Sequence, residues 1–287
     1  MNRPFFRLAP CAALALVACT GIEPELRTLI ERTNPQAGGQ DFHVGPPVEV
    51  ADSGTARFAR ILHEGFRPHR ALELVSFIDR YYRAPANDGY EEVLARLDKE
   101  LRQIGFDGAD PRLEVEFLPA GEVSAWTPLS GKMVLRVEGE EPRTLHAFTE
   151  SEDVDRVMLP VNAPSCALEA DVALRLADLK QGMVLVTNVD VGQVLMRAKN
   201  RGAAAIVSAS LKPFNEDKSG AQRQLEAIQF TTLEPGSDLP VFQISARTKE
   251  AIEDAVERAQ LRGARVRLQL EASVRIEQRP LRTLMAL

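Results

Sequence analysis

Residues 178–208 constrain the fold more than any other part of this chain of 287 residues. Residues 183–186 are a continuous apolar run, as expected of a fully buried strand. Apolar side chains then recur at helical spacing through residues 191–198, and Gly202 stands where a helix commonly ends. A second apolar run, residues 203–207, follows at once. This order of strand, short helix and strand predicts a βαβ crossover with parallel strands.

Two further helices are predicted ahead of this unit. Residues 71–81 carry apolar side chains at helical spacing. Residues 93–104 carry a longer apolar stripe, for which Asn87 or Asp88 is the expected N-cap and Gly105 the end.

Strands are predicted on both sides of the crossover. Residues 114–118 and 132–138 have strand-like patterns, and residues 265–277 alternate apolar and polar side chains. Residues 247–260 predict one more helix, stopped by Gly263. The predicted fold class is therefore α/β (mixed α+β): a helical segment with one strand, followed by a β-rich domain with short crossover helices.

The crossover also carries a family resemblance. Residues 179–186 fit the pattern L-K-x-G-x-V-x-V, residues 198–207 fit A-x-x-x-G-A-x-A-I-V, and residues 240–245 fit P-V-x-x-I-S. These segments resemble the protease-associated (PA) domain of exported peptidases, over residues 125–277. The alternative is an unrelated α/β domain with similar local packing.

The first eighteen residues look like a targeting segment. Arg3 and Arg7 give it a basic start, and residues 8–18 are too short to span a bilayer as a mature helix. Leu16-Val-Ala-Cys19 resembles a bacterial lipobox, which implies cleavage before Cys19 and lipidation of its thiol. The resemblance implies an exported protein, lipid-anchored to the cell envelope and facing the periplasm from the outer membrane. An ordinary secretory signal is the alternative.

Charge and composition exclude one class of partner. Removing Arg3 and Arg7 leaves 33 basic against 41 acidic residues, a net charge of −8. No basic patch with interleaved aromatic residues is present, so nucleic acid is not expected as a partner. The expected partners are the membrane, through the lipid anchor, and either a peptide substrate or a missing catalytic domain.

Cys166 would be the only free thiol after the leader is removed and Cys19 is lipidated. It follows Pro164 and Ser165 in a turn-like stretch. A nucleophilic role would need a base, and no histidine motif accompanies it. We therefore interpret Cys166 as a structural cysteine.

The N-terminal half adds a second resemblance. Residues 77–85 read Phe-Ile-Asp-Arg-Tyr-Tyr-Arg-Ala-Pro, residues 101–106 fit L-x-x-I-G-F, and a strand and the PA-like region follow. This layout resembles the front of the peptidase family 28 zinc aminopeptidases, which remove N-terminal residues from peptides. Residues 280–286 are similar to the strand that opens the catalytic domain of that family.

The same resemblance implies that the zinc ligands and the general base lie C-terminal to residue 287. No catalytic, cofactor-binding or metal-binding residue is therefore assigned in this chain, and zinc is expected only in the missing domain. The four histidines, His43, His63, His69 and His146, do not form a zinc motif: after His63-Glu64, the position of the second histidine is Arg67.

Two pairs of adjacent glutamates are likewise given no catalytic or metal-binding role. Glu91-Glu92 lies on a predicted helix and Glu140-Glu141 in a predicted turn, and both pairs are interpreted as solvated surface residues.

The sequence thus predicts five segments: a signal peptide (1–18), a flexible tether (19–55), a helical segment of peptidase type (56–120), the PA-like domain (125–277) and the start of a missing domain (278–287). Two hypotheses follow. The chain is the front of a lipoprotein zinc aminopeptidase and is inactive by itself, or it is a complete non-enzymatic envelope lipoprotein whose PA-like domain binds peptides or a protein partner.

Overall fold

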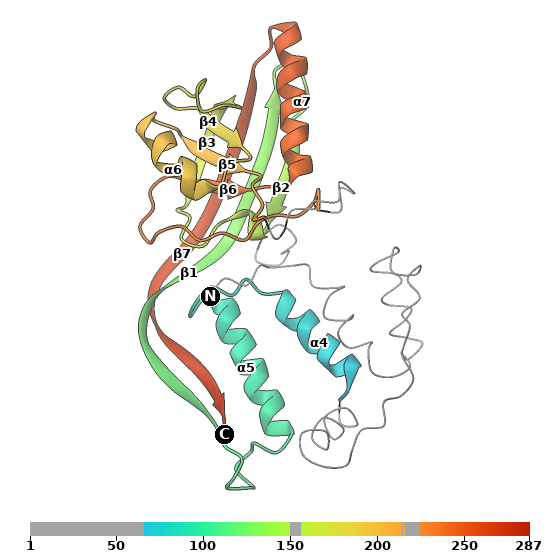
Figure 1. Ribbon diagram of the computed structural model, residues 1–287, viewed down its shortest axis with the longest axis vertical. Coiled ribbons are helices and arrows are strands. Elements are labelled where there is room, and N and C mark those ends of the chain that lie inside the picture. The colour runs from blue at the N-terminus through green and yellow to red at the C-terminus, as the bar shows by residue number, and fades with distance from the viewer. Residues whose placement is uncertain (1–65, 150–155, 214, 216–223) are drawn as a thin grey trace. The chain divides into compact units, whose positions relative to one another are not determined.

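The computed structural model describes residues 66–149, 156–213, 215 and 224–287 (Figure 1). The chain divides into two compact units, Met1–Arg80 and Tyr81–Leu287. In the first unit the described residues form helix α4, Pro68–Asp79. Pro68 suits the first helical turn, because its fixed φ is already helical and its missing N–H would have no partner there. Helix α4 confirms the helix predicted at residues 71–81.

The second unit begins with helix α5, Asp88–Gln103. Its N-cap is Asn87, whose side-chain oxygen accepts a hydrogen bond of 2.9 Å from the N–H of Tyr90. The apolar stripe predicted over residues 93–104 lies on this helix. Gly105 follows with a φ of +113°, a backbone conformation that residues with a Cβ rarely adopt.

The described part of the second unit forms one sheet of seven strands in the order β2–β1–β7–β3–β4–β5–β6. Four neighbouring strands are parallel: β3 (Cys166–Ala173), β4 (Val184–Thr187), β5 (Ala205–Ser208) and β6 (Val241–Gln243). Helix α6, Val191–Asn200, connects β4 to β5. The predicted βαβ crossover and the mixed α/β fold class are therefore confirmed.

The other side of the sheet is antiparallel and is dominated by two long strands. Strand β1 (Val115–Val137) pairs with β7 (Val266–Ala286) along nearly its whole length, and β2 (Arg143–Phe148) pairs with β1. Figure 1 shows β1 and β7 as one curved ribbon.

Strand β1 joins the two segments that were predicted separately at residues 114–118 and 132–138. The intervening residues contain Pro119 and Pro128, which weaken a strand pattern in the sequence. The structure accommodates them at two shifts of register, between Pro119 and Glu122 and between Pro128 and Ser130. Strand β7 also continues nine residues beyond the end predicted at residue 277.

Helix α7, Ala246–Arg262, and the short 3₁₀ helix Arg156–Met158 complete the described elements. The Oγ of Ser245 caps α7 by accepting a hydrogen bond from the N–H of Thr248, and Gly263 ends it in the left-handed conformation, with a φ of +67°. Helix α7 therefore confirms the helix predicted over residues 247–260.

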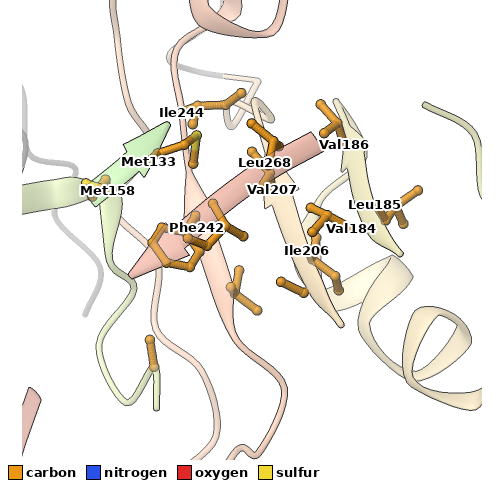
Figure 2. Close-up of a cluster of buried hydrophobic side chains, with 14 of the residues drawn as sticks. Met133, Met158, Val184, Leu185, Val186, Ile206, Val207, Phe242, Ile244 and Leu268 are labelled. Atoms are coloured by element: carbon orange, nitrogen blue, oxygen red, sulfur yellow. The ribbon is translucent and has the colours of Figure 1, made fainter. Parts of the chain in front are cut away.

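The core lies in the part of the sheet built from β3–β6 and the adjoining parts of β1 and β7 (Figure 2). The runs Val184–Thr187 and Ala205–Ser208 are buried at every position, as expected of parallel strands covered on both faces. Several of the largest fully buried side chains meet here, among them Met133, Met158, Phe242, Ile244 and Leu268.

Candidate functional site

The far ends of β1 and β7 extend beyond the other strands of the sheet. We name residues 115–119 of β1 and 282–286 of β7 the distal ribbon, and the residues from Glu122 to Pro280 the sheet body. Among the described residues, the two strands of the distal ribbon pair only with each other, because β2 reaches β1 only at residues 131–135 and β3 reaches β7 only at residues 267–272. Two isolated strands are marginally stable in water.

Burial falls sharply along the two strands. In β7, Leu268, Leu270 and Ala272 are buried, whereas no residue from 273 to 286 is. In the β1 half of the distal ribbon only Val115 is buried. The distal ribbon nevertheless carries apolar side chains, which are half-buried: Leu118, Leu284 and Met285.

Helix α5 shows the same decline. Val93 and Leu94, near its start, are buried, and Leu97 and Leu101 are half-buried. Ile104, just after its end, is 62% exposed. Among the described residues, the apolar stripe of this region is therefore buried at the start of the helix and exposed just beyond its end.

The start of α5 is fixed to the sheet body by neutral hydrogen bonds. The side chain of Asn87, which is 1% exposed, donates to the carbonyl oxygen of Tyr82 at 2.9 Å and to that of Trp126 at 3.3 Å. The rings of Tyr82 and Trp126 lie 5.4 Å apart, and the Tyr82 hydroxyl donates to the carbonyl oxygen of Leu159. Asn87 is thus both the cap of α5 and its buried link to the sheet body.

Charged contacts continue this attachment along β7. Asp88 pairs with Arg275 and, at 2.6 Å, with Arg279, while Glu277 pairs with both arginines, at 3.0 and 2.5 Å. Partial burial raises the pKa of Asp88, but the hydrogen bonds from Arg279 and Arg275 outweigh that effect and hold the pKa below its ordinary value. Asp88 is therefore an ionised anchor at neutral pH.

Later in the first turn of α5, the contacts reach the distal ribbon itself. The Tyr90 hydroxyl donates to the carbonyl oxygen of Arg282 at 2.6 Å, and Glu91 pairs with the Arg282 guanidinium. That guanidinium also lies 4.7 Å from the centre of the Phe117 ring. The interpretation of Glu91 as merely solvated was therefore wrong, because a partner distant in sequence holds it; Glu92 is exposed as predicted.

Most other residues singled out in the sequence do not come together. Cys19, His43 and His63 lie outside the described residues. His69 is exposed on α4, and the Nε2 of buried His146 lies 2.8 Å from the Oγ1 of Thr248. Within the described ranges, no group of three or more His, Cys, Asp or Glu side chains is placed to hold a metal ion. Glu140 pairs with Arg262.

Cys166 lies at the start of β3 and is half-buried. Burial is the main cause that raises the pKa of its thiol, to about 11, and the charge of Glu271 acts in the same direction. A thiol with a raised pKa is a poor nucleophile at neutral pH, which is the behaviour of a structural cysteine.

A surface pocket of about 260 Å³ lies at the other end of the β1–β7 ribbon, where it is lined mainly by arginine and glutamate side chains. Each arginine already has a carboxylate or amide partner on a neighbouring strand: Arg136 with Gln269 and Glu169, Arg265 with Asp171, and Arg267 with Glu169. This pocket therefore indicates no particular ligand. None of the helices in the described residues is long and apolar enough to cross a membrane.

Sequence reasoning missed the residues of β7 that hold α5. Arg275, Arg279 and Arg282 lie in a stretch that was assigned to the end of one domain and the start of another. Their partners lie about 190 positions earlier in the chain, as the separation of 191 residues between Arg279 and Asp88 shows. A local pattern contains no signal for such a contact.

Comparison with known proteins gives a limited result. No protein-family model matches the sequence, and no curated protein does. Among solved structures, the chain is similar to an aminopeptidase from Aneurinibacillus sp. strain AM-1, with 10% identity and a TM-score of 0.40, covering 77% of this chain and 47% of that one. It is also similar to a peptidase M28 precursor from Shewanella amazonensis SB2B, with 14% identity and a TM-score of 0.43, covering 74% of this chain and 48% of that one.

The chain thus spans about half the length of these two structures. TM-scores below 0.5 and identities this low assign neither a family nor an activity to the chain.

Proposed function

We propose that this chain is the N-terminal and PA-domain portion of an exported lipoprotein zinc aminopeptidase, an enzyme that removes N-terminal residues from peptides. In this proposal the catalytic zinc domain is not among the 287 residues. The chain is inactive by itself, and no catalytic, metal-binding or cofactor-binding residue is assigned to it. Lipidated Cys19 anchors the protein to the cell envelope, facing the periplasm.

The observation that carries the proposal is the distal ribbon. It pairs residues 115–119, which precede the PA-like region, with residues 282–286, which follow it. In this proposal the PA-like region is inserted between two paired strands that also belong to the missing catalytic domain. Helix α5 would belong to that domain as well, and the 62% exposure of Ile104, just after the helix, supports this. A domain that adds strands to the ribbon and covers α5 would complete both.

Two of the three motifs quoted for the peptidase resemblance lie near this region. Residues 101–106 cover the end of α5 and the turn after it, and residues 280–286 include the β7 half of the distal ribbon. The sheet body, in contrast, contains the PA-like motifs and most of the core. This division supports a PA-like domain carried on the edge of a catalytic domain, where it would shape access of peptides to the active site.

The first test is the DNA that follows the Leu287 codon in the source gene. We expect it to encode, in one reading frame, a His-x-Asp motif and a Glu-Glu pair, as the resemblance to peptidase family 28 implies. Absence of both motifs from all three forward frames would overturn the proposal.

A second test uses the purified chain and aminoacyl-nitroanilide substrates, with and without added zinc. We expect no hydrolysis in either condition, while circular dichroism shows that the chain is folded. Zinc-dependent hydrolysis would contradict the assignment of the metal site to a missing domain, and variants of His43, His63, His69 and His146 would then locate the ligands.

The alternative is a complete, non-enzymatic envelope lipoprotein whose PA-like domain binds peptides or a protein partner. The continuous core that the sheet body shares with Tyr82 and Ala84 is the observation that favours it. This alternative predicts a monomer without an uncovered apolar surface, so dye binding at the distal ribbon separates it from the first proposal.

A further inference from the structure

The β1–β7 ribbon contains a point at which it can bend. Between the pairs Pro119–Arg282 and Glu122–Pro280, strand β1 has two residues, Ala120 and Gly121, where β7 has only Leu281. Such a bulge disrupts the hydrogen-bonded ladder and bends the strand. Gly121 has a φ of +91°, which places the bulge in a conformation suited to glycine. Opposite the bulge, Pro280 has no N–H to donate.

Helix α5 has contacts on both sides of this bulge. On the side of the sheet body, Asn87 binds the carbonyl oxygen of Trp126, and Asp88 pairs with Arg275 and Arg279. On the side of the distal ribbon, Tyr90 binds the carbonyl oxygen of Arg282 and Glu91 pairs with its guanidinium. All four residues lie in the N-cap and first turn of one helix, so they are held rigidly relative to one another.

We infer that the bulge at Ala120–Gly121 is a hinge between the sheet body and the distal ribbon, and that the first turn of α5 is an ionic splint that fixes its angle. The inference does not depend on the peptidase proposal, because it concerns only contacts within this chain. In a longer protein the same hinge would set how the PA-like domain stands over whatever packs against the distal ribbon.

The charges of the splint make the hinge adjustable. The side chains of Asp88 and Arg282 are 47% and 44% exposed, so water and salt reach the three ion pairs of the splint. Exposed pairs are weak and are screened by salt. Three such pairs can therefore help to hold an angle at low ionic strength and release it when their charges are screened or removed.

The test measures a distance across the hinge by electron–electron double resonance in the full chain, with all three cysteines changed to serine. Spin labels are attached through Gln260→Cys on α7 and Thr283→Cys on the distal ribbon, both at exposed positions. We expect a single narrow distance peak at low salt. The double variant Asp88→Asn, Glu91→Gln should broaden that peak, because only the neutral hydrogen bonds of Asn87 and Tyr90 then connect α5 to the two sides of the bulge.

The matched control is Asp98→Asn. Asp98 pairs with Arg102 along the exposed surface of the same helix, so this change removes a charge from α5 without touching the splint. The control should keep the narrow peak. At about 1 M salt the screening length falls to about 3 Å, so the distance peak of the spin-labelled chain that keeps Asp88 and Glu91 should also broaden. This arm does not depend on whether the double variant folds.

An unchanged narrow peak in the folded double variant and at high salt would show that the ion pairs do not fix the angle, and would overturn the inference. Equal broadening in the Asp98→Asn control would overturn it as well, because the effect would then follow from any charge lost on α5.

Discussion

Cys166 illustrates at the scale of one residue how position in the fold determines chemistry. The thiol is half-buried at the start of β3, and burial raises its pKa to about 11 from an ordinary 9.0. The sequence indicated a structural cysteine because no histidine motif that could supply a base accompanies Cys166. The structure adds a physical reason, because burial disfavours the thiolate form.

We predict that Cys166 in the folded chain alkylates slowly. A pKa of about 11 instead of 9.0 gives a roughly hundredfold smaller thiolate fraction near pH 8. The measurement is the rate of iodoacetamide reaction against pH, in a variant with Cys11→Ser and Cys19→Ser. The same variant unfolded in urea is the reference, and equal rates in the two states would contradict the prediction.

At the scale of one element, α5 combines predicted and unpredicted features. Its stripe, its candidate caps and its glycine end were all expected from the sequence, since each depends on residues within a few positions. The attachment of its first turn to Trp126 and β7 was not expected, because those partners are brought close only by the folded sheet. Nearby residues therefore determine that this helix forms, whereas residues distant in sequence determine where it packs.

Asn87→Ala should destabilise the second unit more than the loss of a helix cap alone. The cap contributes about 1 kcal/mol, and leaving the carbonyl oxygens of Tyr82 and Trp126 without this donor adds about 1–3 kcal/mol. The comparison is Asp190→Ala, which removes the cap of α6 together with a partly exposed ion pair to Lys212, at a more exposed site. Free energies from urea unfolding that were equal for the two variants would refute the extra role of Asn87.

The contribution of Asp88 should depend on pH. Its folded-state pKa lies below the ordinary value of 3.8, so its pairs stabilise the fold above that value. The stabilisation is lost as the pH falls through the lowered pKa, and it is at most about 1 kcal/mol because the side chain is partly exposed. The unfolding free energies of Asp88→Asn and the unchanged chain should therefore differ at pH 6 and converge as the pH falls below 3.8. A difference that stays constant as the pH falls below 3.8 would rule out this linkage.

At the scale of the whole molecule, the second unit combines a well-packed sheet body with an incompletely covered extension. Strands β4, β5 and β6 of the sheet body are buried at every position, whereas Ile104, just after α5, and Leu287, just after β7, are 62% and 61% exposed. Exposed apolar side chains that form a patch mark interaction sites or cause self-association.

Replacing Ile104 and Leu287 by lysine should therefore reduce binding of an apolar dye and reduce self-association, with little change in the free energy of unfolding. The control is Leu261→Lys on α7, a residue that is 85% exposed on the sheet body. Sedimentation velocity and dye fluorescence measure both effects. If Leu261→Lys lowers them equally, the distal ribbon is not a special surface.

The sequence by itself determined the parts of this protein whose patterns are local. The βαβ crossover, helices α4, α5 and α7 and the alternating start of β7 follow from apolar periodicity and from capping residues. Periodicity reports which side of an element is buried, and it needs only neighbouring residues to do so.

Only the tertiary structure decided how these parts connect. It joined residues 114–118 and 132–138 into one strand across two prolines, extended β7 to Ala286, and paired the two far ends into the distal ribbon. It also placed Glu91 and Asp88 against arginines of β7. The physical reason is that distant segments can form strand pairs and ion pairs only when the folding of the whole chain brings them together. The residues next to each segment in the sequence do not determine which partner it meets.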